Sequence, residues 1–152
     1  MGESMDNVDE VVITPLDPAN LPVVLDLLAK SGLPEAGLAE HVATTLVAQV
    51  NGRIVGSAGL EVYARAALLR SVVVDPGLRG QGVGGQLVES ALALAQSRQM
   101  REVYLLTETA VDYFTRYGFV PVDRAVVDPQ VVGSVEFTSA CPVSAQAMQL
   151  VL

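Results

Sequence analysis

The spacing of apolar residues changes from one segment of the chain to the next and predicts an alternation of strands and helices. Residues 11–13 form a short apolar run that indicates a first strand. From Leu21 to Leu28 the apolar residues recur at helical spacing, and the preceding Asp17-Pro18 is typical of a helix start. Residues 35–41 predict a further short helical turn.

A β-hairpin is predicted over residues 43–62. Its first strand, Thr44 to Val50, is rich in β-branched residues. Asn51-Gly52 is a strong two-residue turn signal, after which Ile54 to Val62 forms the return strand. The next strand, Leu68 to Val74, is almost wholly apolar, as expected of a central strand buried on both faces of a sheet.

The second half of the chain continues the alternation of helices and strands. The predicted elements are a helix at about 84–98, a strand at 103–106, a helix at 110–117, a strand at 119–122, a short helix and connection within 123–141, and a strand at 145–152. This order predicts one α/β domain over residues 10–152, after a disordered lead-in at residues 1–9.

Composition and charge narrow the classes of partner. The chain has 152 residues, of which 51% are hydrophobic and 17% charged, which is a globular composition with enough apolar material for one core. A formal net charge of -8 disfavours polyanionic partners, so we expect neither nucleic-acid binding nor attachment to anionic membranes. An anionic ligand would have to be held by local donors.

Cysteine and histidine are too scarce for several kinds of site. Cys141 is the only cysteine and His41 the only histidine, so an internal disulfide is impossible and a zinc site would need several carboxylates. No metal is expected, nor a Ser-His-Asp triad, because nothing places a nucleophile near His41. The acidic start of the chain lacks the features of a signal peptide, and we expect a cytoplasmic location.

The sharpest chemical feature is a glycine-rich loop, Arg79 to Gly85, between the apolar strand and the next helix. Glycine lets backbone N–H groups approach a ligand and tolerates positive φ. The start of the following helix carries unbonded N–H groups and a partial positive charge, to which Arg79 adds a full charge. The loop therefore predicts a phosphate or pyrophosphate site.

A dinucleotide-binding fold is one interpretation of this loop. Gly80, Gly82 and Gly85 satisfy G-x-G-x-x-G. Glu102 lies near the spacing of a ribose-binding acid, but it precedes a strand, whereas that acid should end one. The glycines should also follow the strand directly, and here residues 75–79 intervene. Too little chain follows for a complete dinucleotide domain, so this interpretation is disfavoured.

Two motifs together resemble the GCN5-related N-acetyltransferase (GNAT) superfamily. Val74-Asp75-Pro76-Gly77-Leu78-Arg79-Gly80-Gln81-Gly82-Val83-Gly84 is similar to its acetyl-CoA motif, and Ala110 to Phe119 is similar to the end of its fourth helix, where an aromatic pair precedes Gly-Phe. The resemblance covers roughly residues 10–152. It implies an N-acetyltransferase with the α/β GNAT fold, a mixed, mostly antiparallel sheet of six or seven strands flanked by about four helices.

A narrower resemblance concerns three further segments. Residues 68–72, 104–107 and 137–142 look like the branch of arsenic-resistance N-acetyltransferases, which is close to the amino-acid acetyltransferases of the glutamate type. This branch implies that acetyl-CoA donates its acetyl group to a small-molecule substrate that carries a primary amine and an acid group.

The superfamily resemblance also implies where acetyl-CoA lies. The strand before the glycine loop splays from the next strand, and the pantetheine arm pairs with exposed backbone in the gap. A backbone N–H of that strand can polarise the thioester carbonyl, while the loop N–H groups bind the pyrophosphate. The implied coenzyme-binding residues are Val72, Val73, Val74, Arg79, Gly80, Gln81, Gly82, Val83, Gly84 and Phe114.

Acetyl transfer to an amine needs a base, because a free alkyl amine has a pKa of about 10. Glu61, at the end of the hairpin, is the first candidate, with an exposed structural carboxylate as the alternative; Glu108 is the second. Many members of the superfamily protonate the leaving sulfur with a tyrosine where this chain has Phe114. Tyr113 or Tyr117 could replace it, or water could.

Arg70 stands inside the apolar strand, where a charge needs a partner. It could bind a substrate carboxylate, form a salt bridge with an acid such as Glu61, or lie on an outward face. Ser71 points to the opposite face of a regular strand, so the two could share one pocket only at a bulge. Thr107 and Thr109 could contact substrate or cap the next helix.

Two other functions fit the same motifs. Phe114 in place of tyrosine fits an acetyl-CoA sensor or a catalytically silent relative. The acidic charge could instead attract a basic peptide, as in a protein N-acetyltransferase. The superfamily often dimerises, and the apolar C-terminal strand could extend across a partner, so a homodimer is a further hypothesis.

Overall fold

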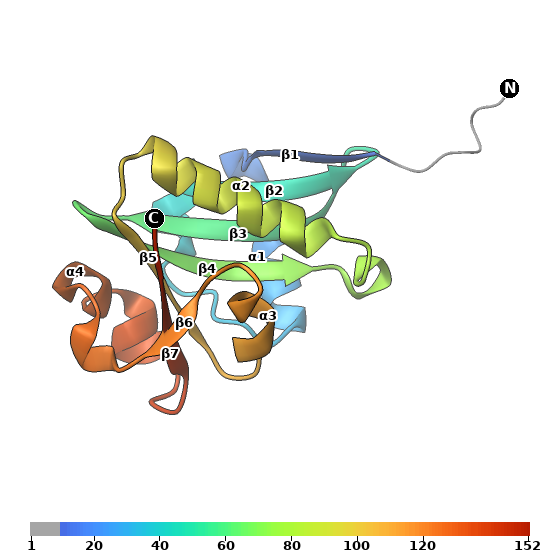
Figure 1. The fold of residues 1–152 in the computed structure, drawn as a ribbon. Helices are drawn as coiled ribbons and strands as arrows, with labels where there is room; N and C mark the ends of the chain where they lie inside the picture. The colour runs from blue at the N-terminus through green and yellow to red at the C-terminus, as the bar shows by residue number, and fades with distance from the viewer. Residues whose placement is uncertain (1–9) are drawn as a thin grey trace, which may run out of the picture.

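Strands from the whole described chain, residues 10–152 of this computed structural model, pair into one seven-stranded sheet (Figure 1). The disordered lead-in predicted for residues 1–9 lies outside the described residues. The strands are β1 (Val11–Pro15), β2 (Thr45–Val50), β3 (Arg53–Val62), β4 (Ala66–Val74), β5 (Glu102–Thr107), β6 (Val120–Val122) and β7 (Gln146–Val151). The α-helices are α1 (Leu21–Lys30), α2 (Val83–Ser97), α3 (Val111–Thr115) and α4 (Pro129–Val132).

The strand order is β1-β2-β3-β4-β5-β7-β6. Only the β4–β5 pair is parallel, and every other neighbouring pair is antiparallel. The parallel pair needs a crossover, which α2 provides, whereas short turns suffice to join β2 to β3 and β3 to β4. The connection from β1 to β2 is longer and contains α1. The mixed, mostly antiparallel α/β sheet implied by the resemblance is therefore confirmed.

The predicted hairpin turn forms as its residues require. Asn51 and Gly52 have φ values of 51° and 77°, the left-handed conformation that a two-residue turn between right-twisted strands needs. The prediction of a strand from Thr44 begins one residue early, because Thr44 closes a 3₁₀ segment, Leu38–Thr44, that replaces the expected helical turn at 35–41.

Helices cover both faces of the sheet, with α2 on one face and α1 on the other (Figure 1). The period of two along β2 shows this directly: Ala48 and Val50 belong to the core under α2, and Val47 to the core under α1. β3 and β4 lie between the two cores and are buried over most of their lengths, as predicted for β4.

The region after α2 departs most from the predicted elements. α3 ends at Thr115 rather than at 117, because Gly118 and Tyr117 donate to carbonyls three residues earlier and tighten the last turn. The stretch 123–141 contains a 3₁₀ turn, α4 and a π-helical turn, η6 (Glu136–Ala140). Such short turns carry no apolar period that sequence could reveal. Among the described helices, none combines the length and apolarity needed to cross a bilayer.

Candidate functional site

The central feature of the site is the divergence of β4 from β5. The two strands pair only from Ala66 to Leu68, opposite Glu102 to Tyr104. Beyond this point they separate, and a cavity of about 870 Å³ opens between residues 69–74 of β4 and residues 105–110. The splayed strands expected from the resemblance are present. β4 leads from one end of this cavity to the glycine loop at the other.

The glycine loop forms one end of the cavity. Gly80 and Gly82 both have φ +83°, and Gly82 precedes the first residue of α2 without any side chain capping the helix. The N–H groups of the first helical turn therefore have no intrahelical acceptor and make the helix start an anion site. We call the loop, residues 79–85, and the α2 start the coenzyme end.

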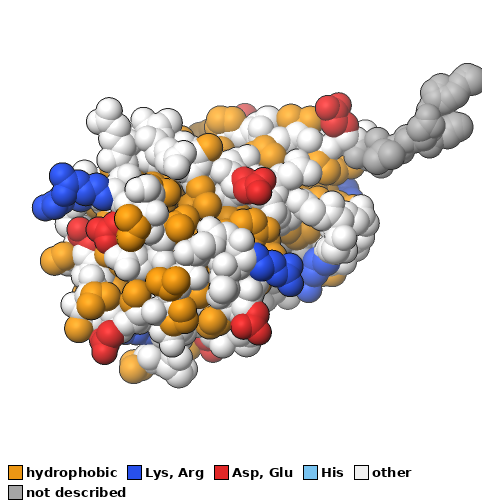
Figure 2. All heavy atoms as spheres, in the orientation of Figure 1, with side chains coloured by type: hydrophobic (Ala, Val, Ile, Leu, Met, Phe, Trp, Pro, Cys, Tyr) orange, Lys and Arg blue, Asp and Glu red, His pale blue; other side chains and the backbone are white. Residues whose placement is uncertain are grey.

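Basic side chains add charge to the coenzyme end. Arg79 and Arg116 line it, and basic side chains gather between α3 and the start of α2 in Figure 2. Arg79 is exposed, and its Nε donates to the Val74 carbonyl at 3.3 Å. Arg116 lies over the Tyr113 ring, 5.6 Å from its centroid. Both guanidinium groups can supplement the main-chain donors without being buried.

Two tyrosines from α3 and the turn after it pack directly against this helix start. A Cβ at Gly84 would lie 2.7 Å from Tyr113 Oη, and one at Gly85 would lie 2.8 Å from Tyr117 Oη. The Tyr117 hydroxyl also donates to Tyr113 Oη at 3.4 Å. Gly84 and Gly85 are therefore required by the tyrosines as well as suited to a ligand, a reason that the motif alone does not reveal.

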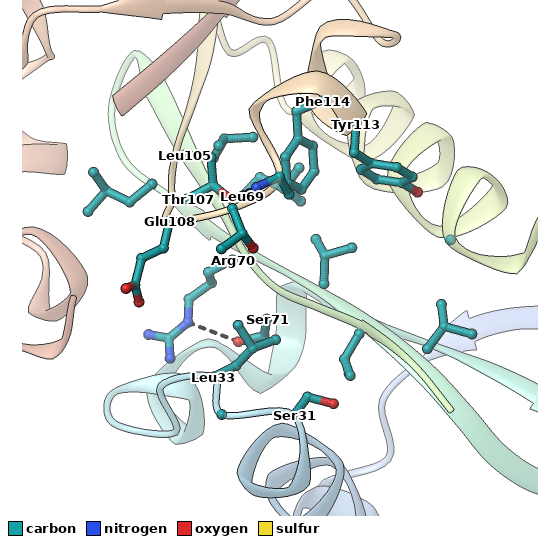
Figure 3. A pocket seen from close by; sticks show the side chains of 18 of the residues that line it. Ser31, Leu33, Leu69, Arg70, Ser71, Leu105, Thr107, Glu108, Tyr113 and Phe114 are labelled. Carbon is teal, nitrogen blue, oxygen red and sulfur yellow. Dashed lines mark hydrogen bonds between the residues drawn. The ribbon is translucent and has the colours of Figure 1, made fainter. Parts of the chain in front are cut away.

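Tyr113, Tyr117 and Phe114 all line the cavity. Burial raises the pKa of Tyr113 above its usual value of 10, so this phenol keeps its proton at neutral pH. Phe114 is buried and packs edge-on against Tyr113 and Phe119, with ring centroids 5.1 Å and 6.0 Å away. Figure 3 shows Phe114 and Tyr113 side by side on one wall. Phe114 is thus a packing residue with one face toward the cavity.

A β-bulge in β4 brings Arg70 and Ser71 to the same face. The β3–β4 register shifts between the Ser57 and Gly59 pairings, and Ser71 has φ +59°. Arg70 Nε donates to Ser71 Oγ at 3.1 Å, so both side chains reach the cavity wall (Figure 3). The condition under which the two could share a pocket is therefore met.

Arg70 is held by two carboxylates. Its Nη1 lies 2.9 Å from Glu61 Oε2 and its Nε 3.4 Å from Glu136 Oε2, and its side chain is fully buried. The salt bridge with Glu61, one of the alternatives for Arg70, is what the structure shows. We call Arg70, Glu61 and Glu136 the acceptor-end triad, because Arg70 and Glu136 line the cavity at the opposite end from the glycine loop and Glu61 is bound to Arg70.

Glu61 occupies a different place from the one expected of a base. Only 2% of its surface is exposed, and it does not line the cavity. Besides Arg70 it accepts a hydrogen bond from the Tyr63 hydroxyl, and His41 Nε2 lies 3.5 Å from it. The alternative of an exposed carboxylate is wrong, because Glu61 belongs to a buried network.

Glu136 and Cys141 are cavity residues that sequence reasoning missed as site residues. Burial raises the pKa of Glu136 to about 7, and nearby Glu61 adds to the rise while Arg70 opposes it. Burial and Glu136 raise the pKa of the Cys141 thiol to about 12, so it remains a thiol at neutral pH. Only the fold could have pointed to Glu136, since no local motif contains it.

The remaining predicted site residues fall into those that line the cavity and those that lie outside it. Thr107, Glu108 and Thr109 line the cavity, and Thr107 Oγ1 also accepts a hydrogen bond from the Ala110 N–H at 2.9 Å. Of the predicted coenzyme residues, all but Gln81 and Val83 line the cavity. Val83 is only 2% exposed and packs in the core under α2, while Gln81 faces a separate hollow beside β1. Within residues 10–152, no three metal-ligating side chains lie close enough together to hold an ion.

Comparison with known proteins identifies the family to which this chain belongs. The family model described as "Acetyltransferase (GNAT) domain" matches residues 41–121. An amino-acid acetyltransferase of Mycobacterium tuberculosis is 34% identical over 82 residues, which are 53% of this chain and 46% of that protein. An uncharacterized N-acetyltransferase of Chlorobaculum tepidum is 30% identical over 56% of this chain and 55% of that protein. The matched regions thus span about half the length of these two curated relatives.

Solved structures share the fold over nearly the whole chain. A Mycobacterium tuberculosis protein in complex with CoA and a ligand named NLQ has a TM-score of 0.80 and 25% identity, covering 93% of this chain and 99% of that one. N-acetylglutamate synthase from Neisseria gonorrhoeae, complexed with coenzyme A and N-acetyl-glutamate, has a TM-score of 0.81 at 15% identity, covering 96% of this chain and 36% of that one. The second likeness concerns the fold alone.

Proposed function

We propose that this chain, which belongs to the GNAT acetyltransferase family, transfers an acetyl group from acetyl-CoA to the primary amine of a small molecule. The family agrees with the enzyme class expected from the sequence. The observation that carries this proposal is the cavity between β4 and β5. One end of it is an anion-binding helix start, and the other end is a polar wall at the β4 bulge.

In this proposal the coenzyme lies along β4. The pyrophosphate binds to the main-chain N–H groups of the loop that includes Gly80, Gly82 and Gly84, with Arg79 beside them. The pantetheine arm follows Val72 to Val74, whose backbone faces the gap that β5 leaves open. The thioester then lies at the bulge, where a strand N–H can polarise its carbonyl.

The leaving sulfur receives its proton either from a tyrosine or from water. Tyr113 carries a proton at neutral pH, as any phenol with a pKa of about 10 does, although burial raises its pKa and makes it a weaker acid than an exposed tyrosine. Tyr117 shares a hydrogen bond with it. Neither ring occupies the position of Phe114, and the thiol of CoA is acidic enough to leave without help, by analogy with a cysteine pKa of about 8.5.

An amino acid or amino-acid analogue bearing an acid group is the proposed acceptor. The amino-acid acetyltransferase of Mycobacterium tuberculosis supports this class by name. Arg70, Thr107 and Thr109 lie on the cavity wall, although Arg70 already has two carboxylate partners. The arsenic-containing analogues, the cytoplasmic location, the homodimer and the limits of a single domain at 10–152 remain predictions.

A catalytically silent acetyl-CoA sensor is the second candidate, and Phe114 favours it because a phenyl ring cannot act as an acid. Thiol release from acetyl-CoA, followed with amino acids and with arsenic- and phosphorus-containing analogues, separates the two candidates. We expect amine-dependent thiol release and an N-acetylated product by mass spectrometry, with the amine-free reaction as the control for hydrolysis. Coenzyme binding without product from any amine or peptide would favour the sensor, and acetylated peptide alone would favour a protein acetyltransferase.

A further inference from the structure

The acceptor-end triad contains one cation and two anions. Arg70 contacts Glu61 through Nη1 and Glu136 through Nε, and all three side chains are buried or nearly so. One guanidinium cannot neutralise two carboxylates, and burial makes an uncompensated charge costly. One of the two carboxylates must therefore either carry a proton or meet another cation.

The two carboxylates differ in their further partners. Glu61 also accepts from the Tyr63 hydroxyl and faces His41 Nε2, and it lies away from the cavity. Glu136 lies on the cavity wall, and the ionisable side chains besides Arg70 that act on it within residues 10–152 are Glu61 and the Cys141 thiol, a weak donor. The excess negative charge of the triad therefore falls on Glu136.

Glu136 is also close to the β4 bulge, where the proposed function puts the thioester. Arg70 Nε, which lies 3.4 Å from Glu136, donates to Ser71 Oγ at the β4 bulge. The carboxylate is thus separated by a single guanidinium from the strand segment that leads to the thioester. It begins a π-helical turn, a rare conformation that occurs frequently at functional sites.

The two ends of the cavity are lined by side chains of opposite charge. Arg79 and Arg116 line the coenzyme end, whereas Glu136 and Glu108 line the acceptor side. The guanidinium of Arg70, the one positive side chain at the triad, is already engaged by carboxylates. The two ends therefore attract groups of opposite charge, the phosphates of an anionic coenzyme and the ammonium group of an acceptor.

We propose that the acceptor enters as a primary ammonium ion that binds the Glu136 carboxylate, and that Glu136 takes the proton that frees the amine for attack. This inference rests on the proposed function and names the base and the charge of the group it acts on. Glu136 would then be a catalytic residue, and Arg70 and Ser71 would position it against the thioester.

The protons of the proposed acetyl transfer balance without any further reactant. The ammonium gives one proton to Glu136, and the neutral nitrogen attacks the thioester carbon, so that a C–N bond forms and the C–S bond breaks. The second nitrogen proton ends on the CoA sulfur, and Glu136 releases its proton to solvent. A base is most effective when its pKa lies near the working pH, and the pKa of Glu136, raised by burial to about 7, fits that requirement.

The pH dependence of Glu136→Gln turnover tests this role, because glutamine keeps the shape and removes the base. In the wild type we expect kcat/KM to rise with pH through an inflection near the pKa of Glu136. In Glu136→Gln we expect that inflection to vanish and kcat/KM to fall on the order of 100-fold, with the acetyl-CoA Kd unchanged. Glu136→Asp should restore part of the rate together with the inflection. The exposed Glu89→Gln is the matched control and should behave as wild type.

Several results would overturn the inference. Wild-type rate and pH profile in Glu136→Gln would remove Glu136 from catalysis, and loss of the inflection in Glu108→Gln instead would assign the base to Glu108. A ¹³C-carboxyl NMR titration of wild-type Glu136 reports its protonation even if the variant fails to fold. A Glu136 carboxyl signal whose titration does not change when amine is added would also contradict the proposal. Absence of turnover by the wild type with every amine would refute the proposed function itself, a result distinguishable from all of these.

Discussion

The two ends of the cavity are built in different ways. The coenzyme end is a continuous stretch of chain whose main-chain N–H groups supply most of the binding, with exposed Arg79 and Arg116 beside it. The acceptor end is built from buried side chains on β3, β4 and a π-helical turn, which meet only in the folded chain. Side-chain replacements should therefore matter much more at the acceptor end than at the coenzyme end.

This difference means that folding stability and catalysis depend on the same residues at only one end of the cavity. At the acceptor end, the charges that would bind and deprotonate an amine are also buried charges that must be compensated for the chain to fold. At the coenzyme end, residues 79–82 of the loop are exposed, and an anionic ligand can bind and dissociate without uncovering a buried ion.

The largest effect is expected for Arg70→Met. Removing the guanidinium leaves Glu61 and Glu136 buried without their common cation, and breaking such a buried pair costs about 3–5 kcal/mol. Urea denaturation at pH 7 measures this loss. Arg53→Ala, which removes the exposed partner of Asp75, is the control and should cost about 1 kcal/mol or less. Equal losses in the two variants would contradict the account of the acceptor end.

The next effect concerns the pH dependence of stability in Glu136→Gln. The pKa of Glu136 is raised from 4.5 to about 7 in the folded chain, so its stabilising contribution is complete below pH 4.5 and is lost as pH rises through 7. Glutamine has no such loss, so the stability of the variant relative to wild type should rise by about 3 kcal/mol across that window. Urea denaturation at pH 5 and pH 8 measures it, and parallel changes in both proteins would show that Glu136 does not titrate there.

A smaller effect is expected where Gly84 meets Tyr113. The Cβ of Gly84→Ala would lie 2.7 Å from Tyr113 Oη, and such overpacking costs about 1–3 kcal/mol. Removing the hydroxyl with Tyr113→Phe should recover part of that stability, since the next ring atom lies 3.7 Å away. A double-mutant cycle in urea measures the coupling. Gly85→Ala is the matched control, because it should be relieved by Tyr117→Phe and not by Tyr113→Phe.

The smallest effect is expected for Arg79→Ala. Arg79 is exposed, and the main-chain N–H groups of the loop are the principal phosphate donors in this account. We expect acetyl-CoA affinity to fall about tenfold or less, a change of about 1.4 kcal/mol at most. Isothermal titration calorimetry measures it, and the difference from wild type should shrink with added salt. A hundredfold loss would mean that the coenzyme end also depends on a side chain.

The two ends of the cavity also differ in how far the sequence could predict them. The coenzyme end was predictable because Arg79 to Gly84 is contiguous, and its glycines, helix start and charge follow from local rules. The sheet and its central strand were predictable from apolar periods and from Asn51-Gly52. What the motif could not show is that Gly84 and Gly85 also make room for tyrosine hydroxyls, since that contact joins distant segments.

The acceptor end could be predicted only in part, for physical reasons. Arg70 was recognised as a charge in need of a partner, and Glu61 was named as one of its possible partners. Glu136, however, lies 66 residues further along the chain than Arg70, in a stretch of short turns without periodicity. The bulge at Ser71 depends on β3 pairing, which no pattern within β4 specifies. Long-range pairing thus decided both features that sequence reasoning missed.

A crystal structure of the wild-type chain with acetyl-CoA tests the central claim most directly. The account predicts that the pyrophosphate accepts hydrogen bonds from main-chain N–H groups between Gly80 and Gly84, that the pantetheine arm runs along β4, and that the acetyl group lies beside Ser71 within reach of Glu136. A coenzyme bound elsewhere, or a gap between β4 and β5 closed by side chains in the complex, would contradict it.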